Sequence, residues 1–145
     1  MSKPRVLFLC TGNSCRSQMA EDWLRHLAGG RFAAFSAGTK PSGLNPLAVA
    51  VMKEVGIDIS HHSSKHVSEC FGQQFPYVIT VCDAAAETCP VFPGASKKLH
   101  WNFLDPATSQ GSEVERLAVF RKVRDEIGAQ IRNFISAGKS RGFFA

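Results

Sequence analysis

The residues from Cys10 to Ser17 combine a thiol, a guanidinium and a hydroxyl at a spacing that suits nucleophilic attack on a bound oxyanion. Five residues separate Cys10 from Arg16, and Ser17 follows directly. The planar guanidinium of Arg16 can hold two oxygens of a phosphate-like ligand and offset their charge. The hydroxyl of Ser17 can donate a hydrogen bond to the sulfur and so stabilise a thiolate. We therefore predict that Cys10 is a nucleophile and that Arg16 binds the oxyanion.

The elements on either side of this run would direct its backbone amides at the anion. Residues 6–9 form a short apolar run typical of a strand, and from Ser17 onward apolar residues recur every three or four positions, as in a helix. The first N–H groups of a helix lack intrahelical partners, and the helix dipole favours an anion there. Gly12 and Asn13 tolerate the positive φ angles of a concave loop. The predicted oxyanion-binding residues are Thr11, Gly12, Asn13, Ser14, Cys15, Arg16 and Ser17. The alternative is a buried strand-end thiol followed by an ordinary turn.

Two further thiols follow a second strand-like run at residues 77–81. Six residues separate Cys82 from Cys89, and four of them, Ala84–Glu87, favour a helix that Pro90 would end. An intact helix would hold the two thiols about 10 Å apart, whereas the Cα atoms of a disulfide lie within about 7 Å. A disulfide between them therefore requires the segment to unwind, which is typical of a redox switch. The alternatives are two unrelated core cysteines or half of a zinc site, but zinc sites use shorter spacings and a second pair, so we expect no metal.

A carboxylic acid follows the strand-like run at residues 98–101. Asp105 precedes Pro106, which favours a non-helical conformation at the aspartate. Loops at the carboxyl ends of parallel strands gather at one edge of the sheet, so Asp105 can meet the Cys10 loop and the Cys82 segment there. An acid beside the sulfur could protonate a departing hydroxide or alkoxide. The alternative is that Asp105 and Pro106 merely start a turn.

Strand-like and helix-like segments alternate along the whole chain. We expect strands at about 4–10, 32–37, 76–82 and 97–101, and helices at about 16–29, 46–55, 64–72 and 113–136. This alternation predicts the α/β class: a single three-layer domain with a four-stranded parallel sheet in the flavodoxin-like order 2-1-3-4 and helices on both faces. The domain is expected to span 1–138, with a flexible tail at 139–145. Apolar stripes predict the core faces of the first and last helices, at Met19, Ala20, Trp23, Leu24 and Leu27 and at Phe120, Val123, Ile127, Ile131 and Phe134.

The thiol, arginine and serine pattern resembles that of the low-molecular-weight tyrosine phosphatases, which carry a Cys, five residues and an Arg-Ser pair near the N-terminus. With the added pair of thiols, the whole chain up to about Gly138 resembles the thioredoxin-coupled arsenate reductases, which place a redox pair on the phosphatase fold. The correspondence runs through Cys10, Ser36-Ala37-Gly38, Met52-Lys53-Glu54-Val55, His62, Cys82, Cys89, Lys97-Lys98, Asp105-Pro106 and Val123-Arg124-Asp125-Glu126-Ile127. The resemblance implies the low-molecular-weight phosphatase topology and assigns Asp105 the role of general acid.

The resemblance also implies a reaction, the reduction of arsenate to arsenite in arsenic resistance. Cys10 attacks arsenic, Cys82 attacks the sulfur of the adduct, and arsenite leaves behind a disulfide between these two cysteines. Cys89 then attacks this disulfide, and thioredoxin reduces the bond that forms between Cys82 and Cys89. No tightly bound cofactor is implied, because thioredoxin supplies the electrons. A glutathione and glutaredoxin route is the alternative donor.

Two other functions compete with the reductase. A low-molecular-weight protein tyrosine phosphatase would hydrolyse phosphomonoesters through a phosphorylated Cys10. It has no need of Cys82 and Cys89, and such phosphatases tend to carry a tyrosine where this chain has Ala107. A non-catalytic anion-binding module would leave the thiols and Asp105 unexplained. Phosphate or sulfate would occupy the same site as arsenate, because their shape and charge are similar.

Cys15 is expected to pack beside the loop, with a redox role as the alternative, and Cys70 has no predicted function. Some arsenate reductases of this kind bind potassium through residues corresponding to Asn13, Glu21 and Ser36, with an acidic residue near position 65. This chain has Lys65, whose ammonium could replace the cation and pair with Glu21, so we predict no metal site. Glu21 could equally be an exposed carboxylate, and His62 is expected to be a hydrogen-bonded structural histidine.

Composition is consistent with a small soluble enzyme. The chain has 145 residues, enough for one core, and 44% of them are hydrophobic. It has no apolar stretch of membrane-spanning length and no signal-peptide pattern at its start. Five cysteines, an odd number, suit a reducing compartment, so we expect a cytoplasmic protein. We also expect a monomer, although no sequence pattern determines the oligomeric state. The net charge of +5 would attract oxyanions, while the dispersed Lys and Arg residues predict no binding to nucleic acid.

Overall fold

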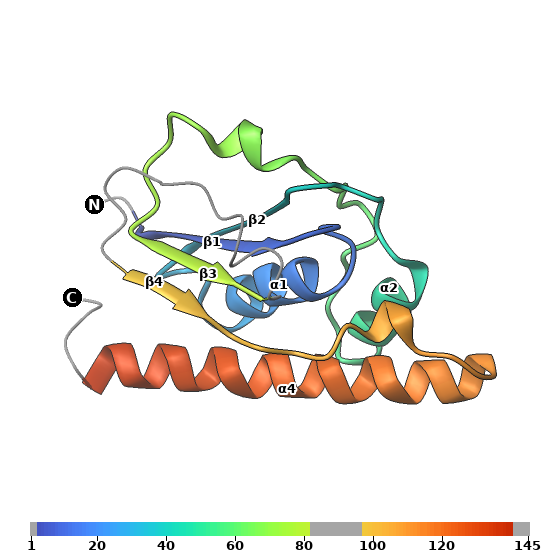
Figure 1. Cartoon of the computed structure of the whole chain (residues 1–145). Helices are drawn as coiled ribbons and strands as arrows, with labels where there is room; N and C mark the ends of the chain where they lie inside the picture. Colours follow the sequence, from blue (N-terminus) through green and yellow to red (C-terminus); the bar gives the residue numbers. More distant parts are fainter. Residues whose placement is uncertain (1–2, 82–96, 141–145) are drawn as a thin grey trace.

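A four-stranded parallel sheet forms the centre of the molecule (Figure 1). The computed structural model describes residues 3–81 and 97–140. Its strands are β1 (Arg5–Cys10), β2 (Ala33–Gly38), β3 (Tyr77–Thr80) and β4 (Lys97–His100). They lie in the order β2-β1-β3-β4, and every neighbouring pair is parallel. The predicted order 2-1-3-4 is therefore confirmed.

Three α-helices connect or follow these strands in the described part of the chain. They are α1 (Arg16–Ala28), α2 (Pro46–Glu54) and α4 (Glu113–Ser140). The side chain of Asn45 caps α2 by accepting a hydrogen bond from the backbone N–H of Leu47, and Pro46 occupies the first turn. Helix α4 extends four residues beyond the expected end and includes the first two residues of the predicted tail. Residues 141–145 lie outside the described part.

The helix predicted at 64–72 is replaced by a short 3-10 helix, η1 (Val67–Cys70). The side chain of His66 accepts a hydrogen bond from the backbone N–H of Ser68, and the side chain of Glu69 accepts one from the backbone of His66. This capping box starts the turn, but Phe71 is already extended and Gly72 has a φ of 84°. The extended and left-handed conformations end the helix after one turn. A second 3-10 helix, η2 (Pro106–Thr108), follows Asp105.

The two faces of the sheet are covered by different elements, which gives the three layers. Helices α1 and α4 pack together on one face, where the ring of Phe134 lies 5.8 Å from that of Trp101 and the ring of Trp101 lies 5.9 Å from that of Phe8. The opposite face is covered by the segment between α2 and β3, which includes η1. There the ring of Phe75 lies 5.5 Å from that of Phe35. The three-layer α/β class is confirmed.

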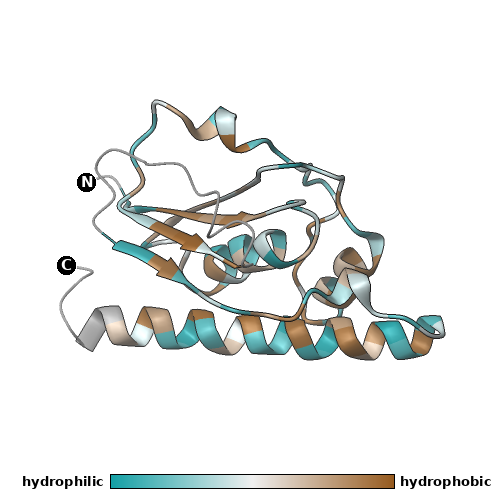
Figure 2. Ribbon diagram, in the orientation of Figure 1, coloured by the Kyte–Doolittle hydropathy of each residue, from teal (hydrophilic) through white to brown (hydrophobic). Residues whose placement is uncertain are grey.

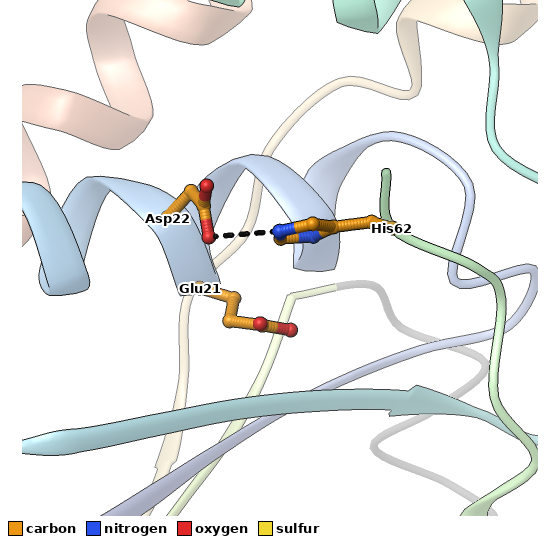
Figure 3. A group of neighbouring side chains, drawn as sticks. All are labelled: Glu21, Asp22 and His62. Atoms are coloured by element: carbon orange, nitrogen blue, oxygen red, sulfur yellow. Dashed lines mark ion pairs between the residues drawn. The ribbon is translucent and has the colours of Figure 1, made fainter. Parts of the chain in front are cut away.

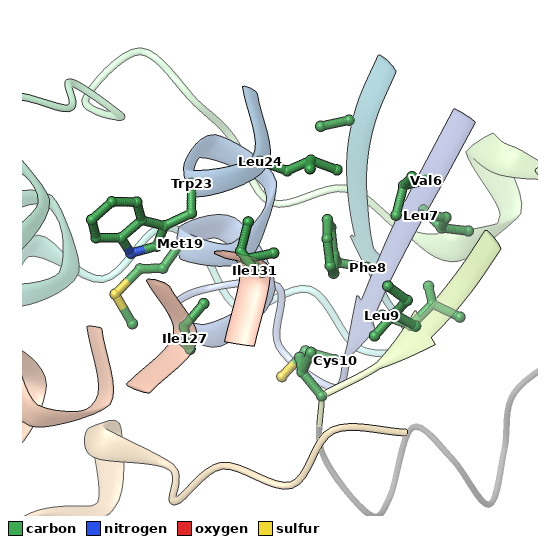
Figure 4. Close-up of a cluster of buried hydrophobic side chains, with 14 of the residues drawn as sticks. Val6, Leu7, Phe8, Leu9, Cys10, Met19, Trp23, Leu24, Ile127 and Ile131 are labelled. Atoms are coloured by element: carbon green, nitrogen blue, oxygen red, sulfur yellow. The ribbon is translucent and has the colours of Figure 1, made fainter. Parts of the chain in front are cut away.

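The core lies on both faces of the sheet, and the four residues at 6–9 of β1 are completely buried (Figure 4). Figure 2 shows largely hydrophobic residues on β3, a β4 that begins with hydrophilic residues, and an α4 that carries both hydrophobic and hydrophilic residues. The predicted core stripes are confirmed, except that Leu27 and Phe134 are only partly buried. Within residues 3–81 and 97–140, none of the helices has a stretch long and apolar enough to cross a membrane.

Candidate oxyanion site at the end of the first strand

Three loops from the carboxyl ends of the strands enclose one cavity of about 460 Å³. Its walls are the loop from Cys10 to Arg16, two residues after β2, Lys40 and Ser42, and two residues after β4, Asp105 and Ala107. Asp105 therefore meets the Cys10 loop, as the edge rule for parallel sheets predicted. Cys82 and Cys89, the predicted redox pair, lie outside the described residues.

The segment after β2 fixes the Cys10 loop from outside through four backbone hydrogen bonds. The donors and acceptors are Thr39 N to Cys10 O (3.3 Å), Lys40 N to Thr11 O (2.9 Å), Ser42 N to Gly12 O (3.0 Å) and Asn45 N to Ser14 O (3.0 Å). A Cβ at Gly12 would lie 2.7 Å from the hydroxyl oxygen of Ser42, and one at Gly38 would lie 2.5 Å from the carbonyl oxygen of Thr11. Gly38 is required because a Cβ there would collide with backbone, whereas a Cβ at Gly12 would force the hydroxyl of Ser42 to move.

Asn13 completes this arrangement from the side of α1. It is completely buried and has a φ of 48°, so the predicted positive φ falls on Asn13. Its carbonyl oxygen accepts hydrogen bonds from Gln18 Nε2 at 3.1 Å and from Ser64 Oγ at 2.8 Å. The carbonyl groups of residues 10–14 are thus all bonded away from the cavity. Because the C=O and N–H of a planar trans peptide point in opposite directions, the amide donors of the loop turn towards the cavity.

The side chain of Asn13 links the loop to three other elements. Its Oδ1 accepts hydrogen bonds from Gln18 Nε2 at 3.1 Å and from the backbone N–H of Lys65 at 2.9 Å. Its Nδ2 donates to Ser17 Oγ at 2.8 Å and to Ser36 Oγ at 3.0 Å. Because the Ser17 oxygen already accepts one bond, its own hydrogen is available to donate. The predicted bond from Ser17 to the sulfur of Cys10 stays a prediction.

Arg16 connects the Cys10 loop to the loop after β4. Its Nη1 donates to the carbonyl oxygen of Phe103 at 3.1 Å, and its Nη2 lies 3.4 Å from Asp105 Oδ2. Its Nε is buried and has no hydrogen-bond partner within the described ranges. A buried donor without a partner is costly, and a bound oxyanion would satisfy it. Asp105 also accepts a hydrogen bond from the backbone N–H of Ala107 at 3.0 Å, so it does start a turn in addition to contacting Arg16.

The thiols of the described residues lie in different environments. Cys10 lines the cavity. Cys15 is 2% exposed, and burial raises its pKa to about 11, against an opposing hydrogen bond from the hydroxyl of Ser14. Burial also raises the pKa of Cys70. Cys15 and Cys70 are therefore neutral thiols near pH 7, and the alternative of a redox role for Cys15 loses support because the thiolate is the reactive form.

A polar cluster lies between α1 and the segment before η1 and contains Glu21, Asp22 and His62 (Figure 3). His62 Nδ1 lies 2.9 Å from Gln18 Oε1, and His62 Nε2 lies 3.3 Å from Asp22 Oδ1. Burial raises the pKa of Asp22, and burial lowers the pKa of His62. Since both ring nitrogens face oxygen acceptors, the pair satisfies both contacts only when it holds a proton between the carboxylate and the ring.

Two basic side chains already neutralise this cluster. The guanidinium of Arg25 donates to both Glu21 and Asp22, and Lys65 Nζ lies 4.0 Å from Glu21 Oε1. A cation would have to displace these contacts, so the donor set does not suit a resident metal ion. Glu21 is 5% exposed, so the alternative of an exposed carboxylate is wrong. His62 is a hydrogen-bonded structural histidine, as predicted.

Several residues that shape the site were missed from the sequence. Gln18 and Asp22 were not singled out, although Gln18, Glu21, Asp22 and Arg25 recur at the spacing of one helical face. A polar stripe of this kind normally faces solvent, which concealed its role. Lys40 and Ser42 were missed because no local pattern indicates that the chain after β2 returns along the Cys10 loop.

The sequence is similar to two kinds of known protein, phosphotyrosine protein phosphatases and arsenate reductases. The sequence model of the family described as low molecular weight phosphotyrosine protein phosphatase matches residues 5–141. The arsenate reductases of Halalkalibacterium halodurans and Bacillus subtilis are each 48% identical over 139 residues, which cover 96% of this chain and 100% of the relative. These similarities extend over nearly the whole chain.

Similar solved structures also include both kinds of protein. A solved arsenate reductase in its phosphate-binding state has a TM-score of 0.75 at 34% identity, over 92% of this chain and 98% of that one. A thioredoxin-dependent arsenate reductase of Corynebacterium glutamicum has a TM-score of 0.73 at 27% identity, over 96% and 63% of the two chains. A low molecular weight protein tyrosine phosphatase of T. tengcongensis has a TM-score of 0.76 at 28% identity, over 93% and 99%.

Proposed function

We propose that this chain, which belongs to the low molecular weight phosphotyrosine protein phosphatase family, is an arsenate reductase that uses Cys10 as its nucleophile. The observation that carries the proposal is the 48% identity to two arsenate reductases over their full length. The geometry supports oxyanion chemistry, because Cys10, Arg16 and Asp105 surround one cavity and Arg16 Nε is a buried donor without a partner in the described part of the chain.

In the proposed first step, the thiolate of Cys10 attacks arsenic and a sulfur–arsenic bond forms. The loop amides and Arg16 hold the arsenate oxygens, whose negative charge they offset. An arsenic–oxygen bond breaks, and Asp105 in its protonated form gives its proton to the departing hydroxide, which leaves as water. Arg16 exchanges its contact with Asp105 for contacts with the oxyanion.

In the proposed second step, the thiolate of Cys82 attacks the sulfur of Cys10. The electron pair of the sulfur–arsenic bond passes to arsenic, which is reduced from As(V) to As(III) and leaves as arsenite. Cys10 and Cys82 are oxidised to a disulfide. Cys89 then attacks Cys82, releases the Cys10 thiolate and leaves a disulfide between Cys82 and Cys89, which a thioredoxin dithiol reduces. The thioredoxin-dependent relative supports this donor.

A coupled assay tests the activity and its electron donor. Arsenite formation is measured with thioredoxin, thioredoxin reductase and NADPH, and in parallel with glutathione and glutaredoxin. We expect turnover with the first set. Turnover only with glutathione and glutaredoxin would show that thioredoxin is not the electron donor, and the proposal that the protein is an arsenate reductase would stand. If neither set gave arsenite and the protein hydrolysed a phosphomonoester through Cys10, the phosphatase would be the correct function.

The cysteine relay has its own test. A Cys89→Ser variant should form about one arsenite per enzyme and then stop, because the disulfide between Cys10 and Cys82 persists. Cys70→Ser is the matched control, since Cys70 is a buried thiol outside the relay, and it should retain multiple turnover. Mass mapping after turnover should find the disulfide between Cys82 and Cys89. Multiple turnover by Cys89→Ser would reject the relay and leave the reductase intact.

We further propose that the protein acts in the cytoplasm as a monomer, without a tightly bound cofactor. The relay needs reduced thiols at the start of each cycle, which a reducing compartment maintains. Light scattering after size-exclusion chromatography measures the oligomeric state. A stable dimer would contradict the monomer but not the chemistry.

A further inference from the structure

The oxyanion cavity contains a second basic side chain besides Arg16. Lys40 lines the cavity and is exposed. Its backbone N–H donates to the carbonyl oxygen of Thr11 at 2.9 Å, and its neighbours Thr39 and Ser42 are bonded to the same loop at 3.3 and 3.0 Å. Pro41 further restricts the backbone. The backbone of Lys40 is therefore fixed at the rim of the cavity, while the ammonium at the end of its flexible side chain can reach into the cavity.

Lys40 differs from Arg16 in what it already contacts. Arg16 is occupied by Asp105 Oδ2 at 3.4 Å and by the carbonyl oxygen of Phe103 at 3.1 Å. Within residues 3–81 and 97–140, the ammonium of Lys40 has no hydrogen bond or ion pair. An arriving oxyanion thus meets a guanidinium whose charge is partly offset by Asp105 and an ammonium whose charge is not.

The charges that line the cavity show why a second cation matters. When Cys10 is a thiolate and Asp105 is ionised, before the acid step, the lining carries two negative groups, and Arg16 alone leaves one negative charge in excess. A doubly charged oxyanion would be repelled by this excess. Lys40 restores neutrality before the ligand arrives.

We propose that Lys40 is an oxyanion-binding residue that selects doubly charged tetrahedral anions at the rim of the Cys10 cavity. Its ammonium attracts the anion by charge at the rim, and Arg16 and the loop then hold the oxygens inside the cavity. This inference rests on the proposed oxyanion chemistry at Cys10 but does not require that the oxyanion be reduced.

The direct test measures the binding of two tetrahedral anions of different charge, sulfate and perchlorate, by calorimetry. Lys40→Gln should raise the Kd for sulfate about five-fold and the Kd for perchlorate about two-fold or less. Lys40→Arg should keep both values within about two-fold of the wild type. The matched control is Lys53→Gln, which removes the same charge from an exposed position on α2 outside the cavity and should change neither value.

Salt and kinetics sharpen the same test. The difference between wild type and Lys40→Gln should shrink between about 0.02 M and about 0.5 M salt, because an exposed charge is screened. In the arsenate assay, Lys40→Gln should raise KM about five-fold and leave kcat within about two-fold, since the rim contact acts on binding. The free energy of unfolding in urea should be the same for Lys40→Gln and Lys40→Arg as for the wild type.

The outcomes separate this proposal from the proposed function. If Lys40→Gln weakened sulfate and perchlorate equally, or weakened neither, the role of Lys40 would be wrong whether or not the protein reduces arsenate. If the protein formed no arsenite but Lys40→Gln still weakened sulfate selectively, Lys40 would be confirmed and the reductase rejected. An equal loss of sulfate binding in Lys53→Gln would show a general effect of net charge and overturn the assignment.

Discussion

Two faces of helix α1 are buried, one through apolar side chains and the other through polar side chains. Towards α4 it presents Met19 and Trp23, whose indole N–H donates to the carbonyl oxygen of Arg124 at 3.1 Å (Figure 4). Towards the segment before η1 it presents Gln18 and Asp22, which both contact His62. Figure 3 shows the contact between Asp22 and His62. We call these the apolar side and the polar side of α1. The apolar side attaches the helix to the core, while the polar side holds the loop that would bind the oxyanion.

The difference shows how one helix can serve stability and function separately. Apolar packing is non-directional, so the apolar side determines where the helix lies but not the conformation of the loop before it. Hydrogen bonds are directional, and those of Gln18 reach the backbone and side chain of Asn13. Damage to the two sides should therefore have different consequences.

The largest effect is expected on the polar side, from Gln18→Ala. The change removes donors to Asn13 O, Asn13 Oδ1 and Ser63 O and the acceptor of His62 Nδ1. His62 Nδ1 loses its acceptor, and Asn13 O, Asn13 Oδ1 and Ser63 O each lose one of two donors, which together should lower the free energy of unfolding by about 3 kcal/mol. Because two of the hydrogen bonds that hold Asn13 are lost, kcat/KM for arsenate should fall by about 100-fold in the folded fraction.

Unfolding in urea and steady-state kinetics on the folded protein check this prediction. Gln73→Ala is the control, since among the described residues the side-chain amide of Gln73 donates only to the backbone carbonyl of Glu69 in η1. It should change both quantities little. A folded Gln18→Ala variant with the wild-type kcat/KM would show that the polar side does not position the loop.

On the apolar side, Gly128→Val should reduce stability without a matching loss of activity. A Cβ at Gly128 would lie 2.9 Å from two ring carbons of Trp23, so the buried ring must move. Overpacking of this kind should lower the free energy of unfolding by about 2 kcal/mol, as measured in urea. The kcat/KM of the folded fraction should stay within about three-fold of the wild type.

The neighbouring change Ala129→Val provides the control, because Ala129 is exposed on α4. It should cost far less stability. If Gly128→Val lowered kcat/KM as much as Gln18→Ala, the two sides of α1 would not be separable.

The apolar side of α1 could be predicted from the sequence, whereas the polar side could not. The apolar side was predicted because Met19 and Trp23 on α1, like Val123 and Ile127 on α4, recur at helical spacing, and all four residues are buried in the fold. Asp105 was placed beside Cys10 by a rule of sheet topology that needs no side-chain detail. The burial of Gln18 depends on the path of the segment that carries His62, which no local pattern determines. Lys40 reaches the cavity for a similar reason, through backbone bonds made far along the chain.

Cys15 lies between the two sides of α1, because it is part of the loop before the helix and its side chain is buried in the apolar core. Burial raises its pKa from 9.0 to about 11, so the folded state keeps the proton after the unfolded state has lost it. The stability that this proton provides is complete below pH 9 and is lost as the pH rises towards 11. It should amount to roughly 3 kcal/mol, since each pKa unit corresponds to about 1.4 kcal/mol.

Urea unfolding of wild type and Cys15→Ala, in the presence of a phosphine reductant, measures this term. Cys15→Ala cannot ionise, so its stability relative to wild type should rise between pH 9 and pH 11. The comparison below pH 9 gives the cost of the cavity alone. A difference that did not change with pH would mean that the thiol is hydrated and belongs to the polar side.

The smallest effect is expected at the outer end of the polar side, from Lys65→Gln. Lys65 Nζ lies 4.0 Å from Glu21, whose carboxylate already contacts Arg25 and the hydroxyl of Ser36. A long, partly exposed ion pair should contribute less than about 0.5 kcal/mol to unfolding. The backbone N–H of Lys65, which donates to Asn13 Oδ1 at 2.9 Å, is unchanged by the substitution. If the variant instead lost about ten-fold in kcat/KM for arsenate, the ammonium would be an essential cation beside the loop, and the polar side would act through its charge rather than through its hydrogen bonds to Asn13.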